Sequence, residues 1–377
     1  MRIGFDGKRA VQNFTGLGNY SRYVADILCH FYPENDYVLY APKKRENKRV
    51  NLLTGQYRQL TLAYPATFFW KKLSSLWRVW GITSQLEKEG IELFHGLSNE
   101  LPLNIHKSRI KSIVTIHDLI FLRYPQYYQS IDRKIYTYKF RKACENADKI
   151  IAISECTKRD IIRYFNIPDD KIEVVYQGCD VSFTHPVTEE KKEEVRKKYQ
   201  LPDHYILNVG SIEERKNILA AVQALPMLPQ HIHIVIVGRR TGYTEKVEQF
   251  IKDNGLGERV HIISNVPFND LPAFYQSAEI FVYPSRFEGF GIPIIEALYS
   301  GIPVVAATGS CLEEAGGPDS IYVNPDDITG LADAFKQIYS NSDKRKNMVE
   351  KGREFAKRFS EKQQSEEIIN IYKKLIR

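Results

Sequence analysis

With 377 residues, of which 43% are hydrophobic and 26% charged, the chain has the size and balance of a folded protein of two domains. Its net charge of +7 is unevenly spread, because residues 1–185 carry 28 lysines and arginines against 19 acidic residues, whereas residues 186–377 carry 25 against 27. The basic first half indicates an anionic partner, such as a membrane surface or a phosphorylated acceptor. No helical segment carries the dense basic face of a nucleic-acid-binding protein, so we expect no nucleic-acid partner.

The sequence shows no signal of membrane insertion or export. No stretch approaches the roughly 18 consecutive apolar residues of a membrane span, and the N-terminus reads as a strand rather than a signal peptide. The five cysteines are scattered and form no CxxC pair, which favours reduced, buried thiols over a zinc site or a disulfide framework. We therefore expect an unprocessed cytoplasmic protein.

Short β-branched or aromatic runs alternate with helical patterns from end to end, which is typical of βαβ units and doubly wound parallel sheets. In the first half the expected strands are residues 3–6, 37–41, 93–95, 112–116, 149–153 and 173–176. In the second half they are residues 205–209, 232–237, 260–263, 280–283, 303–306 and 321–323. Their near-continuous apolar runs indicate strands buried on both faces.

The alternation breaks between the two halves. In residues 189–198 only Val195 is uncharged, which predicts a solvated helix that opens a second domain. We expect Rossmann-like domains at residues 1–185 and 186–360, and a C-terminal helix at residues 361–377 that crosses back to the first domain. Open α/β sheets bind ligands beyond the carboxyl ends of their strands, so a functional site is expected in a cleft between the domains.

Two features of the first domain precede its third expected strand. Gly16 and Gly18 follow the first strand, which Asp6 ends, and both glycines also fit a plain tight turn. Residues 68–80 hold all three tryptophans, with apolar side chains at helical spacing at Phe69, Leu73, Leu76, Trp77 and Trp80, and cations off that stripe at Lys71, Lys72 and Arg78. The spacing predicts a core helix that leads into strand 93–95. The alternative is an amphipathic helix that lies on a membrane.

His117 directly follows a buried strand, at the carboxyl end where an α/β site is expected. Farther along, the first strand of the second domain runs into Ser211, Arg215 and Lys216 as a helix opens. Two adjacent cations at such a place can neutralise a diphosphate that gains negative charge as its bond to a sugar breaks. Taken alone, His117 could equally have a structural role, and Arg215 and Lys216 could be a solvent-exposed basic pair.

The most informative segment is residues 283–301. A strand ends there, and a loop with Glu288, Gly289 and Gly291 leads into a helix with Pro293 in its first turn. Glycines let the backbone approach a ligand closely, and the amides and dipole of a helix start favour an anion such as a pyrophosphate. Glu288 and Glu296 can face one ligand and accept sugar or ribose hydroxyls. A capped helix start with two surface glutamates explains the same residues.

This segment resembles the E-x7-E motif of the retaining family 4 glycosyltransferases of GT-B fold, and the resemblance runs nearly the length of the chain. It implies that Glu288 contacts the donor sugar and Glu296 the donor ribose. It also implies that Arg215 and Lys216 grip the donor phosphates, although many members have an arginine where this chain has Ser211. The glycine-rich loop would close over these phosphates, and the histidine would orient the donor sugar.

The resemblance thus assigns catalytic roles to His117, Arg215, Lys216 and Glu288. It assigns donor binding to Gly16, Gly18, Ser211, Gly289, Phe290, Gly291, Ile292 and Glu296, with Asp6 as a further candidate. No metal is expected, because no Asp-x-Asp motif occurs in the chain. No cofactor is expected beyond the nucleotide sugar that serves as donor substrate.

The order Arg-Lys-Asn at residues 215–217 resembles bacterial mannosyltransferases of surface polysaccharide synthesis, which favours GDP-mannose over UDP-hexose donors. The implied reaction moves the hexose, with retention, to a glycan or lipid-linked saccharide, at or near the inner face of the membrane if the protein contacts it peripherally. The alternatives are another GT-B enzyme, a phosphorylase or an epimerase, or a non-catalytic sugar-binding protein with two lobes.

Overall fold

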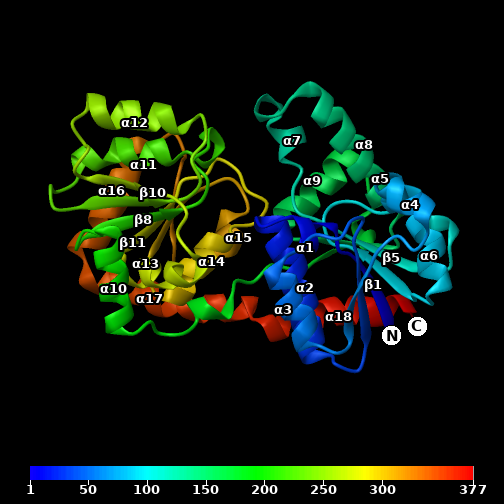
Figure 1. Cartoon of the computed structure of the whole chain (residues 1–377). Helices are drawn as coiled ribbons and strands as arrows, with labels where there is room; N and C mark the ends of the chain where they lie inside the picture. The colour runs from blue at the N-terminus through cyan, green and yellow to red at the C-terminus, as the bar shows by residue number, and fades with distance from the viewer. Residues whose placement is uncertain (377) are drawn as a thin grey trace. The chain divides into compact units, whose positions relative to one another are not determined.

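The computed structural model describes residues 1–376 of the chain (Figure 1). They form two compact units: Met1–Tyr176 together with the C-terminal residues from Glu361 onward, and Gln177–Ser360. The second unit begins before residue 186 because Phe183, which is fully buried, packs its ring against Phe268 and Tyr275 of that unit, at centroid distances of 5.8 and 5.3 Å.

The first unit contains a parallel sheet of seven strands in the order β3-β2-β1-β4-β5-β6-β7. The strands are β1 (Arg2–Asp6), β2 (Asp36–Tyr40), β3 (Leu60–Ala63), β4 (Leu93–Gly96), β5 (Lys111–Ile116), β6 (Lys149–Ala152) and β7 (Ile172–Val174). The sequence did not predict β3, because this edge strand is only partly buried and so lacks the continuous apolar run of its neighbours.

Helices connect and cover these strands. They are α1 (Lys8–Gln12), α2 (Gly16–Phe31), α3 (Lys48–Gln56), α4 (Phe68–Lys72), α5 (Ser74–Leu76), α6 (Ile82–Lys88), α7 (Ile120–Arg123), α8 (Ser130–Asn146), α9 (Glu155–Phe165) and the C-terminal α18 (Glu361–Ile376). Ile368, Ile369 and Tyr372 of α18 are buried in one apolar cluster with α2 and β1. The C-terminal helix is therefore part of the core of the first unit.

The second unit repeats the design with six parallel strands in the order β10-β9-β8-β11-β12-β13. They are β8 (Tyr205–Val209), β9 (His233–Val237), β10 (Val260–Ile263), β11 (Ile280–Tyr283), β12 (Val304–Ala307) and β13 (Ile321–Val323). Its helices are α10 (Glu189–Tyr199), α11 (Ile218–Ala224), α12 (Thr244–Asp253), α13 (Leu271–Ser277), α14 (Ile292–Ser300), α15 (Leu312–Gly316), α16 (Ile328–Ser340) and α17 (Ser342–Ala356). The expected pair of Rossmann-like parallel sheets is confirmed.

The core helix predicted over residues 68–80 is wrong. The chain forms α4, α5 and a π-helical turn, Trp77–Gly81, because the helix breaks at Leu73 and the wider turn rotates later residues away from a 3.6-residue spacing. Of the predicted stripe only Trp77 is buried, whereas Phe69, Leu73, Leu76 and Trp80 are 39–60% exposed. Arg78, expected to face water, is instead an ion-paired residue with 11% of its side chain exposed.

No helix among residues 1–376 is both long and apolar enough to cross a bilayer.

Candidate functional site

The motif residues of the second unit gather where its strand order reverses. β8 and β11 are neighbours in the sheet, and the chain leaves them in opposite directions, toward β9 and toward β12. The loops after their carboxyl ends carry Arg215 and Lys216 on one side and Glu288 on the other. Such a switch point is where doubly wound sheets bind their ligands.

Arg215 and Lys216 lie on a short 3-10 turn, Glu214–Lys216, that precedes α11 rather than in the helix itself. Asn217 ends this turn with a left-handed backbone, φ 55°, a conformation that asparagine tolerates better than most residues. Nδ2 of its side chain donates to the carbonyl oxygens of Pro284 and Pro325, at 3.3 and 2.8 Å. These bonds fix the cations against the loop that follows β11.

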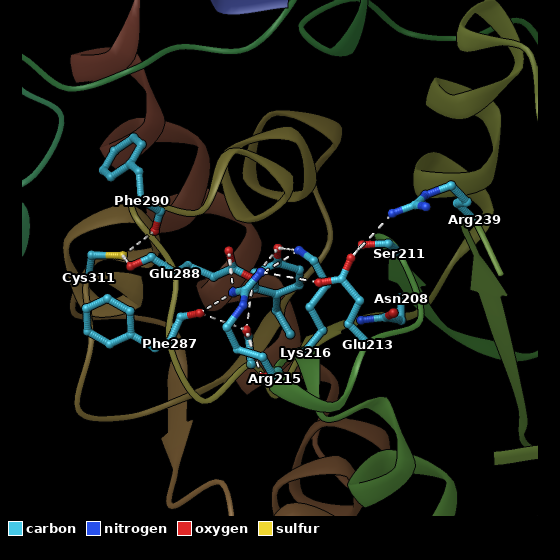
Figure 2. Close-up of polar contacts among 12 residues, drawn as sticks. Asn208, Ser211, Glu213, Arg215, Lys216, Arg239, Phe287, Glu288, Phe290 and Cys311 are labelled. Carbon is cyan, nitrogen blue, oxygen red and sulfur yellow. Dashed lines mark hydrogen bonds and ion pairs between the residues drawn. The ribbon is translucent and has the colours of Figure 1, made fainter. Parts of the chain in front are cut away.

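Both cations bind the same carboxylate. Nη1 of Arg215 lies 2.9 Å from Oε2 of Glu288, and Nζ of Lys216 lies 2.9 Å from Oε1 (Figure 2). Ser285 donates its hydroxyl to Oε1 at 2.8 Å, and Nζ of Lys216 also donates to the hydroxyl of Tyr283 at 2.8 Å. All three charged side chains are 13–17% exposed, so the cluster is largely but not wholly removed from water.

The charges of this cluster stabilise one another. Burial by itself raises the pKa of Glu288, but Lys216 and Arg215 outweigh it and lower that pKa to about 2. Burial likewise opposes the charge of Lys216, and the nearby Glu288 raises its pKa above the ordinary range. The cluster is therefore fully ionised at neutral pH, with one net positive charge among its three members.

Glu296 lies on α14 in a different environment. Its Oε2 accepts a hydrogen bond from the hydroxyl of Tyr275 at 2.6 Å. Burial raises the pKa of Glu296 to about 7, since Tyr275 lowers it only in part and the nearby Asp180 raises it further. The two glutamates of the motif are thus held in different states, one as a fixed carboxylate and one poised to gain or lose a proton near neutral pH.

The loop between the two glutamates is shaped by its backbone. Gly291, which caps α14, has φ 133°, and a Cβ there would lie 3.1 Å from Cδ2 of Leu312, so only glycine fits well. The thiol of Cys311 lies 2.9 Å from the carbonyl oxygen of Phe290 and 3.0 Å from that of Glu288. The ring of Phe290 is buried and lies apart from the charged cluster (Figure 2). This residue can contact a donor only through its backbone.

The remaining donor-site candidates of the second unit flank the cluster. The hydroxyl of Ser211 donates to Oε1 of Glu213 at 2.6 Å, and Oε2 of Glu213 lies 3.7 Å from Arg215. Ile292 is the first residue of α14 and is partly buried. Gly289 is also partly buried, in the loop beside Glu288.

His117 belongs to the first unit and is held rigidly. Its Nε2 donates to the carbonyl oxygen of Leu97 at 2.9 Å, its backbone N–H donates to Oδ1 of Asn99 at 2.7 Å, and the Tyr20 ring packs edge-on at 4.6 Å. Burial lowers the pKa of His117 to about 4, so the imidazole is neutral at pH 7. A neutral, fixed imidazole can orient a ligand through a hydrogen bond, but it does not supply a positive charge.

The glycines of the first unit differ from expectation in their setting. Both lie in the first turn of α2, not in a loop before it. A Cβ on Gly18 would approach the carbonyl oxygen of Asn13 to 1.9 Å, so the close packing of α1 on α2 requires glycine there, whereas Gly16 faces open space. Oδ1 of Asn13 also accepts from the backbone N–H groups of Thr15 and Gly18, at 2.8 and 3.2 Å.

Asp6 forms an ion pair with Arg78, which the sequence predicted to be solvent-exposed. Both oxygens of Asp6 accept from Nε and Nη2 of Arg78, the shortest contact being 2.5 Å, and Nη1 of Arg78 donates to Glu100 at 2.7 Å. The pairing of Arg78, the partnership of Tyr275 with Glu296 and that of Tyr283 with Lys216 were all missed from the sequence. No spacing rule links these residues, which lie 21 to 72 positions from their partners.

Comparison with known proteins identifies the family of this chain. Residues 21–183 match the family model described as Glycosyltransferase Family 4, and residues 189–355 match Glycosyl transferases group 1. The O-antigen chain mannosyltransferase B of Escherichia coli is 31% identical over 289 residues, which cover 75% of this chain and 74% of the relative. The chain belongs to the family 4 glycosyltransferases. A second relative of this glycosyltransferase, the O-antigen chain mannosyltransferase RfbU of Salmonella typhimurium, is 29% identical over 60% of either chain.

Solved structures show the same fold. A glycosyltransferase from Rickettsia africae matches with a TM-score of 0.79 at 20% identity, covering 100% of this chain and 98% of its own. Anabaena Alr3699/HepE, solved in complex with UDP and glucose, matches with a TM-score of 0.77 at 18% identity over the full length of both chains. The architecture of this glycosyltransferase is therefore GT-B.

Proposed function

We propose that this glycosyltransferase transfers mannose, with retention of configuration, from GDP-mannose to a glycan or lipid-linked saccharide in cell-surface polysaccharide synthesis. The observation that carries the proposal is the buried cluster of Arg215, Lys216 and Glu288 at the switch point of the second unit. Two of its relatives are O-antigen chain mannosyltransferases, which supports mannose as the sugar and a surface polysaccharide as the product.

The two cations meet the charge of the leaving group. As the bond between the anomeric carbon and the diphosphate oxygen breaks, negative charge develops on that oxygen, and preorganised cations in a partly dry site stabilise it strongly. Diphosphate oxygens compete with Glu288 for the same two cations, and this competition turns the Glu288 carboxylate toward the hydroxyls of the donor sugar. The acceptor oxygen bonds to the anomeric carbon from the face that the leaving group vacates, and its proton passes to an oxygen of the departing diphosphate.

The other residues bind and orient the donor. Glu296 accepts a hydrogen bond from a ribose hydroxyl. The hydroxyl of Tyr275 donates to its Oε2 at 2.6 Å and so holds the carboxyl group in place. The glycine-rich turn at Gly16 and Gly18 contacts the donor phosphates, and neutral His117 hydrogen-bonds to the sugar. No step uses a metal ion or another cofactor, because the cations of Arg215 and Lys216 supply the positive charge.

A thermal-shift measurement against a panel of nucleotide sugars tests the choice of donor. We expect GDP-mannose and GDP to raise the Tm, and UDP-glucose, UDP-galactose and UDP to leave it unchanged, because a ligand that binds only the folded state stabilises it. A UDP-hexose is the second candidate donor, which the UDP and glucose complex of the structural neighbour favours. A shift with the UDP compounds alone establishes that candidate instead.

A radiolabelled-sugar assay tests retention and the acceptor. Transfer to lipid-linked saccharide from a bacterial membrane extract, followed by digestion with an α-mannosidase, should release the label, because GDP-mannose carries an α-linked sugar and retention preserves that linkage. Release by a β-mannosidase instead rejects the retaining mechanism.

A further inference from the structure

Large apolar side chains are exposed on two segments of the first unit that are far apart in the sequence. From α4 to the π-helical turn the exposed ones are Phe68, Phe69, Leu73, Leu76 and Trp80; on α8 they are Ile131, Ile135, Tyr136 and Tyr138. Phe68 is 73% exposed and Ile131 is 65% exposed. Single exposed apolar residues are ordinary on a protein surface, but a gathering of this size marks an interaction site.

The two segments border one cavity. A hollow of about 330 Å³ is lined by Val79 of the π-helical turn, by Ile135 and Tyr138 of α8, and by Leu101 and Leu103 between them. Ion pairs also join the segments, because Glu100 binds Arg78 at 2.7 Å and Lys139 of α8 at 3.5 Å. In Figure 1, α4 and α5 lie near α8 in the same part of the first unit. The two segments thus border a common hollow, and their exposed apolar residues are together called the aromatic face.

Positive charge surrounds the aromatic face. Residues 47–86 contain no aspartate or glutamate, and the exposed Lys71 and Lys72 lie in the middle of that stretch. Nζ of Lys72 sits 4.7 Å from the centre of the Phe68 ring. On α8, Lys134 and Arg141 are exposed beside Tyr138. Lysine next to exposed phenylalanine, tryptophan and tyrosine is the composition of a surface that meets lipid headgroups with its cations and the acyl boundary with its rings.

We propose that the aromatic face docks this chain on an anionic lipid bilayer. The apolar side chains of both segments enter the headgroup region, and Lys71, Lys72 and Lys134 pair with acidic lipid headgroups. The charge complementarity selects an anionic bilayer over an apolar protein partner, because the exposed Lys71, Lys72, Lys134 and Arg141 outnumber the less exposed Glu100 and Asp132 around the rings. The proposal goes beyond the transfer reaction and does not rest on the identity of the donor.

Vesicle sedimentation of the full chain tests the apolar part of the surface. The wild type should pellet with vesicles of phosphatidylcholine and phosphatidylglycerol, and Phe68→Ser/Phe69→Ser should bind at least about tenfold more weakly, because interfacial binding scales with buried apolar area. The matched control is Leu52→Ser, since Leu52 is 74% exposed on α3 and lies outside the aromatic face. Equal loss in the control, or none in the double variant, overturns the proposal.

Charge variants test the selection of acidic lipid. Each lysine near an anionic surface contributes roughly fivefold to binding, so Lys71→Gln/Lys72→Gln should weaken binding about 30-fold, and phosphatidylcholine vesicles should bind neither protein well. Lys43→Gln/Lys44→Gln, on an exposed loop, is the matched control. Arg78 is left unchanged because it pairs with Asp6 and Glu100. Equal binding to neutral and anionic vesicles refutes the proposal.

Light scattering distinguishes a bilayer from a second copy of the chain as the occupant. We expect the wild type and Phe68→Ser/Phe69→Ser to have the same mass in the absence of vesicles. A wild-type dimer that this double variant breaks would overturn the proposal in favour of an interface between copies. The Tm of the same samples shows whether the variants are folded. The change in Tm on addition of the donor nucleotide reports donor binding separately, so a failure of the docking proposal can be told from a failure of the proposed donor.

Discussion

Nζ of Lys216 and Oε1 of Glu288 lie 2.9 Å apart, although 72 positions separate the two residues in the sequence. The contact joins the loop after β8 to the loop after β11, and Arg215 reinforces it from the same side at 2.9 Å. The two loops, one proposed to bind the donor phosphates and the other the donor sugar, are therefore one electrostatic unit. Changes to either loop should alter the other.

Removal of either cation should slow transfer. Lys216→Ala and Arg215→Ala should each lower kcat/KM roughly 30- to 1,000-fold. This corresponds to about 2–4 kcal/mol of lost transition-state stabilisation, as is typical for the loss of a preorganised charged contact. Lys336→Ala, an exposed lysine of α16, is the control. Turnover close to wild type in both variants would show that the leaving group is stabilised elsewhere.

The two glutamates of the motif should differ in their kinetic effects. Glu296→Gln weakens the proposed contact with ribose, which ground state and transition state would share, so it should mainly raise the donor KM. Glu288→Gln alters the group that is proposed to lie beside the departing diphosphate and the sugar, so it should mainly lower kcat. Steady-state kinetics over a range of donor concentrations measures the split. The opposite assignment of KM and kcat would mean that the motif binds the donor in the reverse direction.

The pKa of Glu296 predicts a pH-dependent stability. Because burial raises this pKa from 4.5 to about 7, the folded state binds a proton that the unfolded state has released between these values, and stability from this group falls as pH rises through the window. Glu296→Gln removes the ionisation, so its Tm relative to the wild type should increase from pH 5 to pH 7.5. Differential scanning fluorimetry at several pH values measures the trend, with Glu350→Gln of α17 as the control. A constant difference in Tm contradicts the assignment.

Chelation should leave transfer intact. Within residues 1–376 the structure has no group of three or more histidine, cysteine, aspartate or glutamate side chains placed to hold a metal ion. Since Arg215 and Lys216 carry the positive charge of the proposed site, we expect the initial rate in EDTA to equal the rate in buffer alone. Loss of the rate in EDTA and its recovery with manganese would contradict the proposed role of the cations.

The C-terminal helix should contribute measurably to the stability of the first unit. The hydroxyl of Tyr372 on α18 lies 2.6 Å from Nδ1 of His95, whose Nε2 lies 2.8 Å from the hydroxyl of Thr115, and all of these atoms are buried. Tyr372→Phe leaves His95 with one buried partner fewer, which should cost about 1–3 kcal/mol and lower the Tm. Tyr138→Phe, on the exposed side of α8, should leave the Tm unchanged. Equal Tm values for the two variants would contradict the expected role of this contact.

The sequence by itself determined the fold class and most of its strands. Residues 234–237 and 280–283 are apolar without interruption because parallel strands at the centre of these sheets are covered on both faces, and that demand is local. Gly291 and the two glutamates were singled out because they lie at a loop that leads into a helix start, and their roles were implied by the resemblance to the family 4 glycosyltransferases. β3 was missed because an edge strand has one face partly exposed, and its residues carry no such continuous signal.

Only the tertiary structure decided which side chains meet. The sequence places Arg78 on the polar side of a helical stripe, but a π-helical turn rotates it onto Asp6 and Glu100, and four apolar residues of the stripe become exposed instead. Glu288 and Glu296 look alike in the sequence, yet cations lower the pKa of one and burial raises that of the other. Local propensity acts over a few residues, whereas burial and charge pairing depend on contacts that close only when distant loops come together at the end of a sheet.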